Sequence, residues 1–204
     1  MLSTINYMSG NISTHRVKRN DELGRISIEE FKEHSKLPVT IVLDNVRSQH
    51  NIGSVFRTAD SFIMERVILC GICATPPTAE IHKSALGAEF SVDWEYFTET
   101  IDAVKKLKEE GYTIISIEQA ENSISLENAV KKIYGDLSGS GKERKKTALI
   151  FGNEVKGVSQ SVVDASDYVI EIPQFGTKHS LNISVSAGMV LWEFCKALLI
   201  EQKK

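Results

Sequence analysis

Cysteine is scarce in this chain. The 204 residues include three cysteines, an odd number without a disulfide framework, which favours a reducing compartment. Cys70 and Cys73 make a lone CxxC, and only the distant Cys195 could join them as a zinc ligand. The residues from Arg66 to Cys70 are also typical of a buried strand. We therefore expect neither a metal site nor a redox role for these cysteines.

Long hydrophobic runs are also lacking. The first 20 residues are polar and are broken by Gly10, so they have no continuous apolar core like that of a secretory signal. The apolar C-terminal stretch is interrupted by Glu193 and Lys196, and no run approaches the roughly 20 residues needed to cross a bilayer. From these absences we expect no membrane contact and a cytoplasmic protein.

Neither sign of charge dominates. The chain has 24 basic and 27 acidic residues and a formal net charge of −3, whereas nucleic-acid-binding proteins usually carry a basic footprint. Local charge differs, because residues 142–146 hold four basic side chains and one acidic side chain. A second basic cluster consists of Arg16, Lys18, Arg19 and Arg25. Each cluster is consistent with either a contact to RNA phosphates or a solvated loop.

Strand-like and helix-like apolar patterns alternate along the chain. Near-continuous runs are typical of strands buried on both faces, and Val55, Phe56, Ala59 and Phe62 fall at helical spacing. Strands are predicted at 39–43, 67–70, 112–117, 148–151 and 168–172, and helices at 27–34, 55–63, 78–86, 100–110, 159–165 and 183–201. This alternation predicts an α/β fold with a parallel sheet flanked by helices.

Length and composition suit one domain with a sizeable core, since 42% of the residues are hydrophobic and 25% are charged. We expect residues 1–20 to form a flexible N-terminal arm and residues 21–204 to form a single domain. Residues 135–146 are predicted to be a mobile loop, because glycine and serine precede the basic run.

Polar residues gather where three of the predicted strands end. Residues 44–59 follow the first strand, residues 152–157 follow Phe151, and residues 173–184 follow Ile172. Ligands bind beyond the carboxyl ends of the strands in parallel sheets. We therefore expect these three segments to form the functional site.

The common nucleotide-binding and hydrolase motifs are missing. No GxGxxG follows any strand, which argues against a dinucleotide site. Residues 139–142 hint at a phosphate loop, but Glu143 stands where Ser or Thr must hold magnesium, and a strand rather than a helix follows. Ser180 lies beside His179 without a GxSxG motif, so a hydrolase triad is not indicated.

Together, the three polar segments resemble the three signature motifs of the SpoU–TrmH family of RNA 2′-O-ribose methyltransferases, a family within the SPOUT superfamily. Their order, their places at strand ends and their spread from about residue 39 to residue 197 carry the resemblance. The matching positions are Asn51, Gly53 and Arg57 in the first motif, Gly152, Glu154 and Gly157 in the second, and Ile172, Gly176, Ser180, Leu181 and Asn182 in the third.

The resemblance implies a fold and a cofactor. Proteins of this type have a C-terminal deep trefoil knot, and S-adenosylmethionine lies bent within it, held largely by backbone groups. On that pattern the cofactor-binding residues are Gly152, Ile172, Leu181 and Ile117. Glycine lets backbone approach a ligand closely, although Gly152 is equally consistent with an ordinary turn.

The resemblance also implies the catalytic residues. A ribose 2′-hydroxyl needs to lose its proton or to have its developing charge stabilised, and Arg57 is the main candidate. Arg57 is assigned either as the base or as an anchor for phosphate and charge; a guanidinium with a pKa above about 12 is a poor base. Asn51, Glu154, Ser180 and Asn182 complete the catalytic set. From sequence alone, Asn51 and Asn182 are equally consistent with helix N-caps.

These implications predict an enzyme that methylates a ribose 2′-hydroxyl of tRNA or rRNA and that works without a metal. The alternatives are a catalytically silent RNA-binding protein of the same fold and a generic nucleotide-binding α/β protein. The motifs handle ribose and cofactor, so they do not identify the RNA or the nucleotide. Family members bury their last helix in a homodimer that completes the active site, and the apolar residues of 183–201 are expected to do the same.

Overall fold

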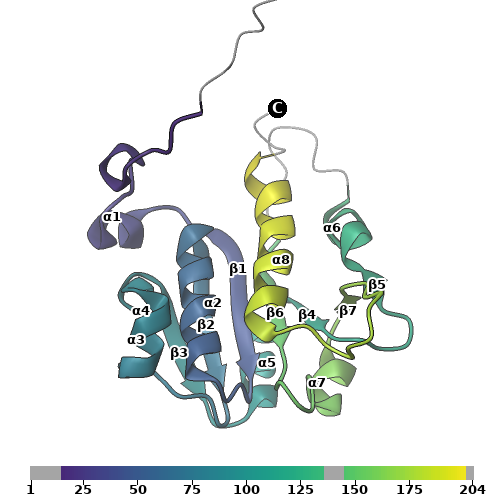
Figure 1. Ribbon diagram of the computed structural model, residues 1–204. Coiled ribbons are helices and arrows are strands. Elements are labelled where there is room, and N and C mark those ends of the chain that lie inside the picture. Colours follow the sequence, from purple (N-terminus) through teal and green to yellow (C-terminus); the bar gives the residue numbers. More distant parts are fainter. Residues whose placement is uncertain (1–14, 136–144, 201–204) are drawn as a thin grey trace, which may run out of the picture.

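The computed structural model describes residues 15–135 and 145–200 (Figure 1). Within these ranges, strands and helices alternate along the chain. The strands are β1 (Leu37–Asp44), β2 (Met64–Cys70), β3 (Asp93–Phe97), β4 (Thr113–Ile117), β5 (Ile124–Ser125), β6 (Thr147–Phe151) and β7 (Tyr168–Glu171). The α-helices are α1 (Ile28–Glu33), α2 (Gln49–Ser61), α3 (Ala79–Ala85), α4 (Ala88–Ser91), α5 (Thr100–Glu109), α6 (Leu126–Tyr134), α7 (Gln160–Ala165) and α8 (Ile183–Cys195). A 3₁₀ turn, η1 (Asn20–Glu22), precedes α1, and a π-helical turn, η2 (Lys196–Ile200), extends α8.

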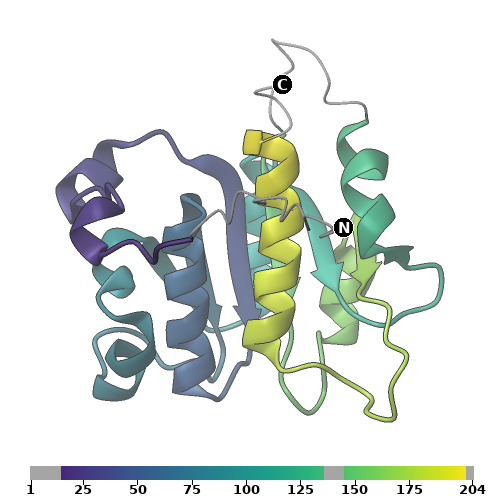
Figure 2. The same cartoon turned by 45° about the horizontal axis from the view of Figure 1, so that its top comes forward.

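The seven strands form one parallel sheet in the order β3-β2-β1-β6-β4-β7-β5. Helices α2 and α8 lie side by side on one face, with α3 and α4 beyond α2 and α6 beyond α8, while α5 and α7 cover the opposite face (Figures 1 and 2). The predicted α/β fold with a parallel sheet flanked by helices is therefore confirmed.

Two apolar cores lie on the two faces of the sheet. Successive residues of a strand point to opposite faces, so the interior strands divide their side chains between the cores. In β1, Ile41 and Leu43 pack on the face with α2 and α8, and Val42 packs on the face with α5 and α7. Both faces are covered, which explains why the central strands read as continuous apolar runs.

Register aligns the carboxyl ends of the central strands. Leu43 of β1 and Ile117 of β4 both pair with Phe151 of β6, and Ile117 also pairs with Ile170 of β7. The chain segments that leave these strands therefore start from the same edge of the sheet. This register brings the three polar segments together.

Several helix boundaries follow the predicted signals. Ser27 and Glu30 form the expected capping box at the start of α1, with the Ser27 Oγ accepting from the Glu30 amide at 3.1 Å. Gly111 follows α5 with φ of +83°, a backbone conformation that favours glycine. None of the helices in the described part of the chain is both long enough and apolar enough to cross a membrane.

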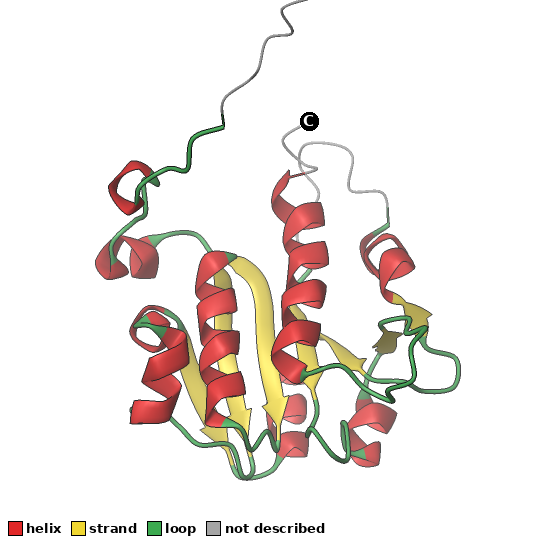
Figure 3. Cartoon of the chain, in the orientation of Figure 1, coloured by secondary structure: helices red, strands yellow, loops and turns green. Residues whose placement is uncertain are grey.

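The sequence patterns predicted none of β3, β5, α4 and α6 (Figure 3). Strand β3 is at the sheet edge and carries charged and aromatic residues in alternation, so it lacks the continuous apolar run of a buried strand. Strand β5 has two residues, which is too short for any periodicity. Most of the predicted loop at 135–146 lies outside the described residues.

Candidate functional site

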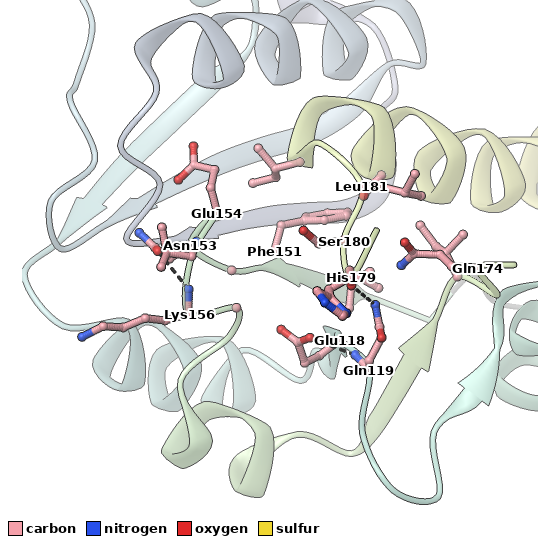
Figure 4. Close-up of a pocket in the computed structure, with 17 residues that line it drawn as sticks. Glu118, Gln119, Phe151, Asn153, Glu154, Lys156, Gln174, His179, Ser180 and Leu181 are labelled. Atoms are coloured by element: carbon pink, nitrogen blue, oxygen red, sulfur yellow. Dashed lines mark hydrogen bonds between the residues drawn. The ribbon is translucent and has the colours of Figure 1, made fainter. Parts of the chain in front are cut away.

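A pocket of about 320 Å³ opens at the carboxyl edge of the sheet, where segments from β4, β6 and β7 meet (Figure 4). Its lining combines apolar and polar residues. The lining residues are Ile117, Glu118, Gln119, Phe151, Gly152, Asn153, Glu154, Val155, Lys156, Gly157, Ile172, Gln174, His179, Ser180, Leu181, Ile183 and Ser186. The second and third polar segments of the sequence thus line one cavity together.

The four residues predicted to bind a cofactor all line this pocket. Gly152 and Ile117 follow or end neighbouring strands, whereas Ile172 and Leu181 belong to the segment between β7 and α8. Ser180 also lines the pocket. The structure therefore brings together residues that are up to 64 positions apart, since 181 − 117 = 64.

A chain of side-chain hydrogen bonds joins the three predicted motifs beside the pocket. The Asn51 Nδ2 donates to the Glu154 Oε1 at 3.1 Å, and the Asn182 Nδ2 donates to the Asn51 Oδ1 at 3.3 Å. The Asn182 Oδ1 accepts from the Ser184 amide at 2.9 Å, which fixes the direction of both amide groups. One N–H of Asn51 and one of Asn182 have no partner among the described residues and remain available to a substrate.

The N-cap alternative can now be decided for both asparagines. Ser48 is the N-cap of α2, because its side chain accepts from the Asn51 amide at 3.2 Å. Asn51 therefore lies in the first turn, with its side chain directed to Glu154. Asn182 is the N-cap of α8, and its side chain also donates a hydrogen bond to Asn51.

Glu154 is held as a carboxylate. Partial burial raises its pKa, but hydrogen bonds from its own amide, from Asn51 and from the amides of Arg47 and Ser48 lower it by more, so the net shift is downward. The two amides lie 3.3 Å from the carboxylate oxygens. This anion connects the start of α2 to the segment after β6 and supplies negative charge at the pocket rim.

Arg57 stands apart from this cluster. Its side chain is exposed and has no hydrogen bond or ion pair with any residue in 15–135 or 145–200. Arg57 follows Asn51 by six positions, which places the two side chains roughly 120° apart around α2. Glu154 therefore contacts Asn51 and not Arg57 within a single chain.

Close packing of the chain on itself explains the motif glycines at positions 53 and 152. A Cβ on Gly152 would lie 2.1 Å from the backbone of Gly157 and Val158, and a Cβ on Gly53 would lie 2.4 Å from the Ile81 carbonyl oxygen. The glycine at position 152 is thus required by the turn rather than by space for a ligand. Gly176 has nothing within 4 Å of a Cβ, so the described residues do not demand glycine there.

Four polar residues that sequence reasoning did not assign hold the site segments in place. Buried Asp44 accepts hydrogen bonds from the Thr100 Oγ1 at 2.5 Å and from the Ser159 amide at 3.0 Å. The Asn153 Nδ2 donates to the Asn45 carbonyl oxygen at 2.7 Å. The other two are Glu118 and Gln119.

Glu118 and Gln119 directly follow β4. The Glu118 Oε2 accepts from the Val158 amide at 2.8 Å. The Gln119 Nε2 donates to the His179 carbonyl oxygen at 2.8 Å (Figure 4). The sequence signal that could have identified these two residues is their position, because they are polar residues at the end of a fourth strand.

The cysteines lie in the core. Burial raises the pKa of the Cys70 thiol to about 12, and burial also raises the pKa of Cys73. The Cys73 Sγ donates to the Leu43 carbonyl oxygen at 3.3 Å. High thiol pKa values oppose nucleophilic chemistry. Among the described residues, no group of three or more His, Cys, Asp or Glu side chains is placed to hold a metal ion.

The fold and the site define an α/β protein that has a pocket beyond the carboxyl ends of its parallel strands, beside an amide–carboxylate cluster. Residues 38–192 match the family model described as the SpoU rRNA Methylase family, and the chain belongs to this family.

Named relatives agree with this membership. The chain is 30% identical over 166 residues to a putative TrmH family tRNA/rRNA methyltransferase of Staphylococcus haemolyticus, an alignment that covers 81% of this chain and 61% of that protein. It is 30% identical over 180 residues to the 23S rRNA (guanosine-2′-O-)-methyltransferase RlmB of Neisseria meningitidis, covering 88% of this chain and 67% of that protein. The chain thus spans about three fifths to two thirds of the length of these relatives.

Solved structures share the fold. The A. aeolicus TrmH/SpoU tRNA modifying enzyme superposes with a TM-score of 0.69 at 22% identity, covering 83% of this chain and 81% of that chain. An AdoMet-bound rRNA methyltransferase from Sinorhizobium meliloti superposes with a TM-score of 0.67 at 23% identity, covering 81% of this chain and 61% of that chain.

Proposed function

We propose that this protein transfers a methyl group from S-adenosylmethionine to a ribose 2′-hydroxyl of tRNA or rRNA. The observation that carries the proposal is the hydrogen-bonded set of Asn51, Glu154 and Asn182 beside a pocket lined by the second and third motifs. Family membership supports it, as do relatives named as tRNA/rRNA and 23S rRNA methyltransferases.

The pocket suits the proposed cofactor. Its volume of about 320 Å³ lies within the range of small-molecule sites. Ile117, Ile172 and Leu181 offer apolar surface for a planar base, and Glu118 and Glu154 place negative charge near a cationic ligand. Gly152 exposes backbone at the pocket wall. The cofactor supplies the methyl group from its sulfonium, so the protein has to bind, orient and manage the proton.

In this proposal the catalytic groups act on the RNA. Arg57 stabilises the charge on the ribose oxygen or anchors the neighbouring phosphate, for which the planar guanidinium is suited. Asn51 and Asn182 direct their remaining N–H groups toward the substrate, Glu154 fixes the Asn51 amide, and Ser180 completes the polar wall.

We also propose a homodimer that completes the site, because Arg57 has no partner within the described part of one chain. On α8, Val185, Met189 and Trp192 are each more than 40% exposed and follow one another at helical spacing. The Trp192 ring lies 5.9 Å from the ring of Phe62, the residue that ends α2. A second copy covering this stripe would therefore also approach the helix that carries Arg57. The other apolar residues expected at this interface are in the core of one chain instead; they are Val190, Phe194 and Leu198.

The finer points of the fold belong to the same proposal. We infer a deep trefoil knot in the C-terminal part, supported by the path of the chain. After central β6 the chain runs through α7 to β7, and α8 then returns across the sheet to pack against α2.

We also propose one domain over 21–204 and an arm over 1–20. In support, residues 15–30 are exposed and Phe31 is the first buried side chain that the structure describes.

The RNA partner and the cytoplasmic location remain part of the proposal. Three buried free cysteines suit a reducing compartment, where tRNA and rRNA are found. The basic cluster at residues 16–25 carries less unpaired positive charge than its sequence indicates, because Arg16 pairs with Glu22 at 3.1 Å and Arg19 pairs with Asp21 at 3.0 Å.

The test is transfer of a tritiated methyl group from S-adenosylmethionine to total tRNA and rRNA, followed by nuclease digestion and nucleoside analysis. We expect label in 2′-O-methylated nucleosides. Label on a base would contradict the proposed ribose chemistry. RNA binding without transfer would instead support the catalytically silent alternative.

A further inference from the structure

Two loops that contribute residues to the pocket lining also carry strongly exposed apolar side chains. Phe175 is 98% exposed and Val155 is 83% exposed. Among the described residues, only Val17, at 89%, is a large hydrophobic side chain with similar exposure. Single exposed apolar residues are common on protein surfaces, but two extreme cases on two loops at one pocket need a reason.

Hydrogen bonds connect both loops to the rest of the site. Val155 lines the pocket itself, and the Asn153 Oδ1 holds its turn by accepting from the Val155 amide at 2.9 Å and from the Lys156 amide at 3.2 Å. Phe175 directly follows Gln174, which also lines the pocket. The segment of Phe175 is tied to β4 by the bond between Gln119 and the His179 carbonyl oxygen. These bonds hold backbone groups of the two loops, and the Val155 and Phe175 side chains take no part in them.

The surroundings of this pair indicate a polyanion with flat apolar faces. Lys156 follows Val155, and Lys178 lies three residues after Phe175, and both lysines are exposed without an ion pair among the described residues. An aromatic platform flanked by cations is the arrangement that proteins use to bind unpaired nucleic acid, because a base stacks on the ring while the cations contact phosphates.

We propose that Phe175 is a stacking platform for a nucleobase of the RNA substrate, with Val155 bounding the same site. This inference rests on the proposed function and extends it to the substrate class. A base buried in a duplex has both faces covered by its neighbours, so the platform takes an unstacked nucleotide. The methylated ribose therefore lies in or beside a loop, a bulge or an unpaired end, and not within a continuous helix.

The test compares Phe175→Ala, Phe175→Leu and Phe175→Trp with the wild type. Unmodified tRNA and rRNA serve as methyl acceptors, and anisotropy of 5′-labelled RNA measures binding. Loss of one base–aromatic stack should raise KM and Kd for RNA roughly five- to a hundredfold in Phe175→Ala. Phe175→Leu keeps apolar surface but has no ring, so it should stay impaired, whereas Phe175→Trp should restore binding. Cofactor affinity should not change in any variant.

Phe90→Ala is the matched control, since Phe90 is an exposed phenylalanine on α4 that does not line the pocket. It should behave like the wild type. Wild-type KM and Kd in Phe175→Ala would overturn the platform, and so would full rescue by Leu. Conversion of Phe175→Ala to a monomer in light scattering would assign the residue to contact with a second copy instead. If the wild type transfers no methyl group, the proposed function fails, and the anisotropy measurement still decides the platform.

Discussion

Glu154 connects parts of the chain that are more than 100 residues apart, since it accepts hydrogen bonds from the Asn51 side chain and from the amides of Arg47 and Ser48. A carboxylate with three such donors is an organising anion rather than a proton acceptor. In the proposed site, Glu154 keeps Asn51 in one orientation, and the remaining N–H groups of the cluster are directed to the substrate.

The lowered pKa of Glu154 predicts a pH dependence. The folded pKa lies below the ordinary value of 4.5, so the carboxylate contributes stability that is fully present above that value and is lost as the pH falls through the folded pKa. Between about pH 6 and about pH 3.5, the free energy of unfolding should fall less in Glu154→Gln than in the wild type. Urea unfolding across this range measures the difference. Glu121→Gln, which removes an exposed carboxylate, is the control, and equal slopes for all three proteins would contradict the account.

Gly152 is packed against backbone in the turn that forms one wall of the pocket. A methyl group there would collide with the backbone of Gly157 and Val158, so the turn that forms one pocket wall would have to move. Gly152→Ala should lose roughly 1–3 kcal/mol of stability, as overpacked sites do, and should also lose cofactor affinity. Gly176→Ala meets no atom and should leave both quantities unchanged. Melting temperature and calorimetric titration measure the two effects, and a stable Gly152→Ala that binds normally would refute the packing argument.

At the level of elements, the sequence predicts the strands that are buried on both faces of the sheet. The central strands β1, β6 and β4 were predicted within two residues because covered strands show as apolar runs. The edge strand β3 was missed because Trp94 and Tyr96 alternate with charged residues and are partly exposed. Short elements such as β5 and α4 depend on tertiary contacts and leave little local signal.

For the candidate site, too, the sequence predicted one part and not another. Strand ends with small and polar residues marked the motif positions, and the register of the sheet then brought them to one edge. The contacts that arrange the site were not predictable, since Glu118, Asn153 and Asp44 act through partners far away in sequence. The capping role of Ser48 was hidden for a related reason: several polar residues at 44–51 could each begin the helix.

Helix α8 leaves a stripe of apolar side chains exposed. Its exposed stripe of Val185, Met189 and Trp192 should lie in a dimer interface, so Met189→Glu should place a charge there and separate the subunits. Ile72→Glu alters a similarly exposed apolar residue outside this stripe and should not. Light scattering at micromolar concentration reports the mass, and turnover should fall together with dimerisation. A wild-type protein that is monomeric under these conditions would contradict the interface.

Over the whole molecule, basic and acidic residues nearly balance. The net charge is −3, and ion pairs neutralise Arg16 and Arg19 within the N-terminal segment. The proposed RNA affinity must therefore come from local groups, of which the basic run at 142–146 is the most concentrated, although residues 142–144 lie outside the described structure.

Neutralising the basic side chains of 142–146 should weaken RNA binding and flatten its salt dependence. Each phosphate that the protein no longer neutralises should lower the slope of log K against log salt by about 0.7–0.9, because fewer counterions are released. Binding isotherms at several salt concentrations give this slope. Neutralising Lys105 and Lys108 on α5, which are exposed, is a control of the same charge type. An unchanged slope in the 142–146 variant would identify that run as a solvated loop.

Paired measurements on Arg57→Ala decide whether the three motifs form a methyl-transfer site. The Arg57 side chain is exposed and makes no hydrogen bond or ion pair that stabilises the described fold, so the melting temperature and the cofactor affinity should stay close to wild type. Turnover at saturating RNA should fall about a hundred- to a thousandfold, the usual effect of losing one preorganised charge partner. Arg57→Lys should also fail, because an ammonium lacks the planar fork. Near-wild-type methylation of RNA by Arg57→Ala would contradict the account.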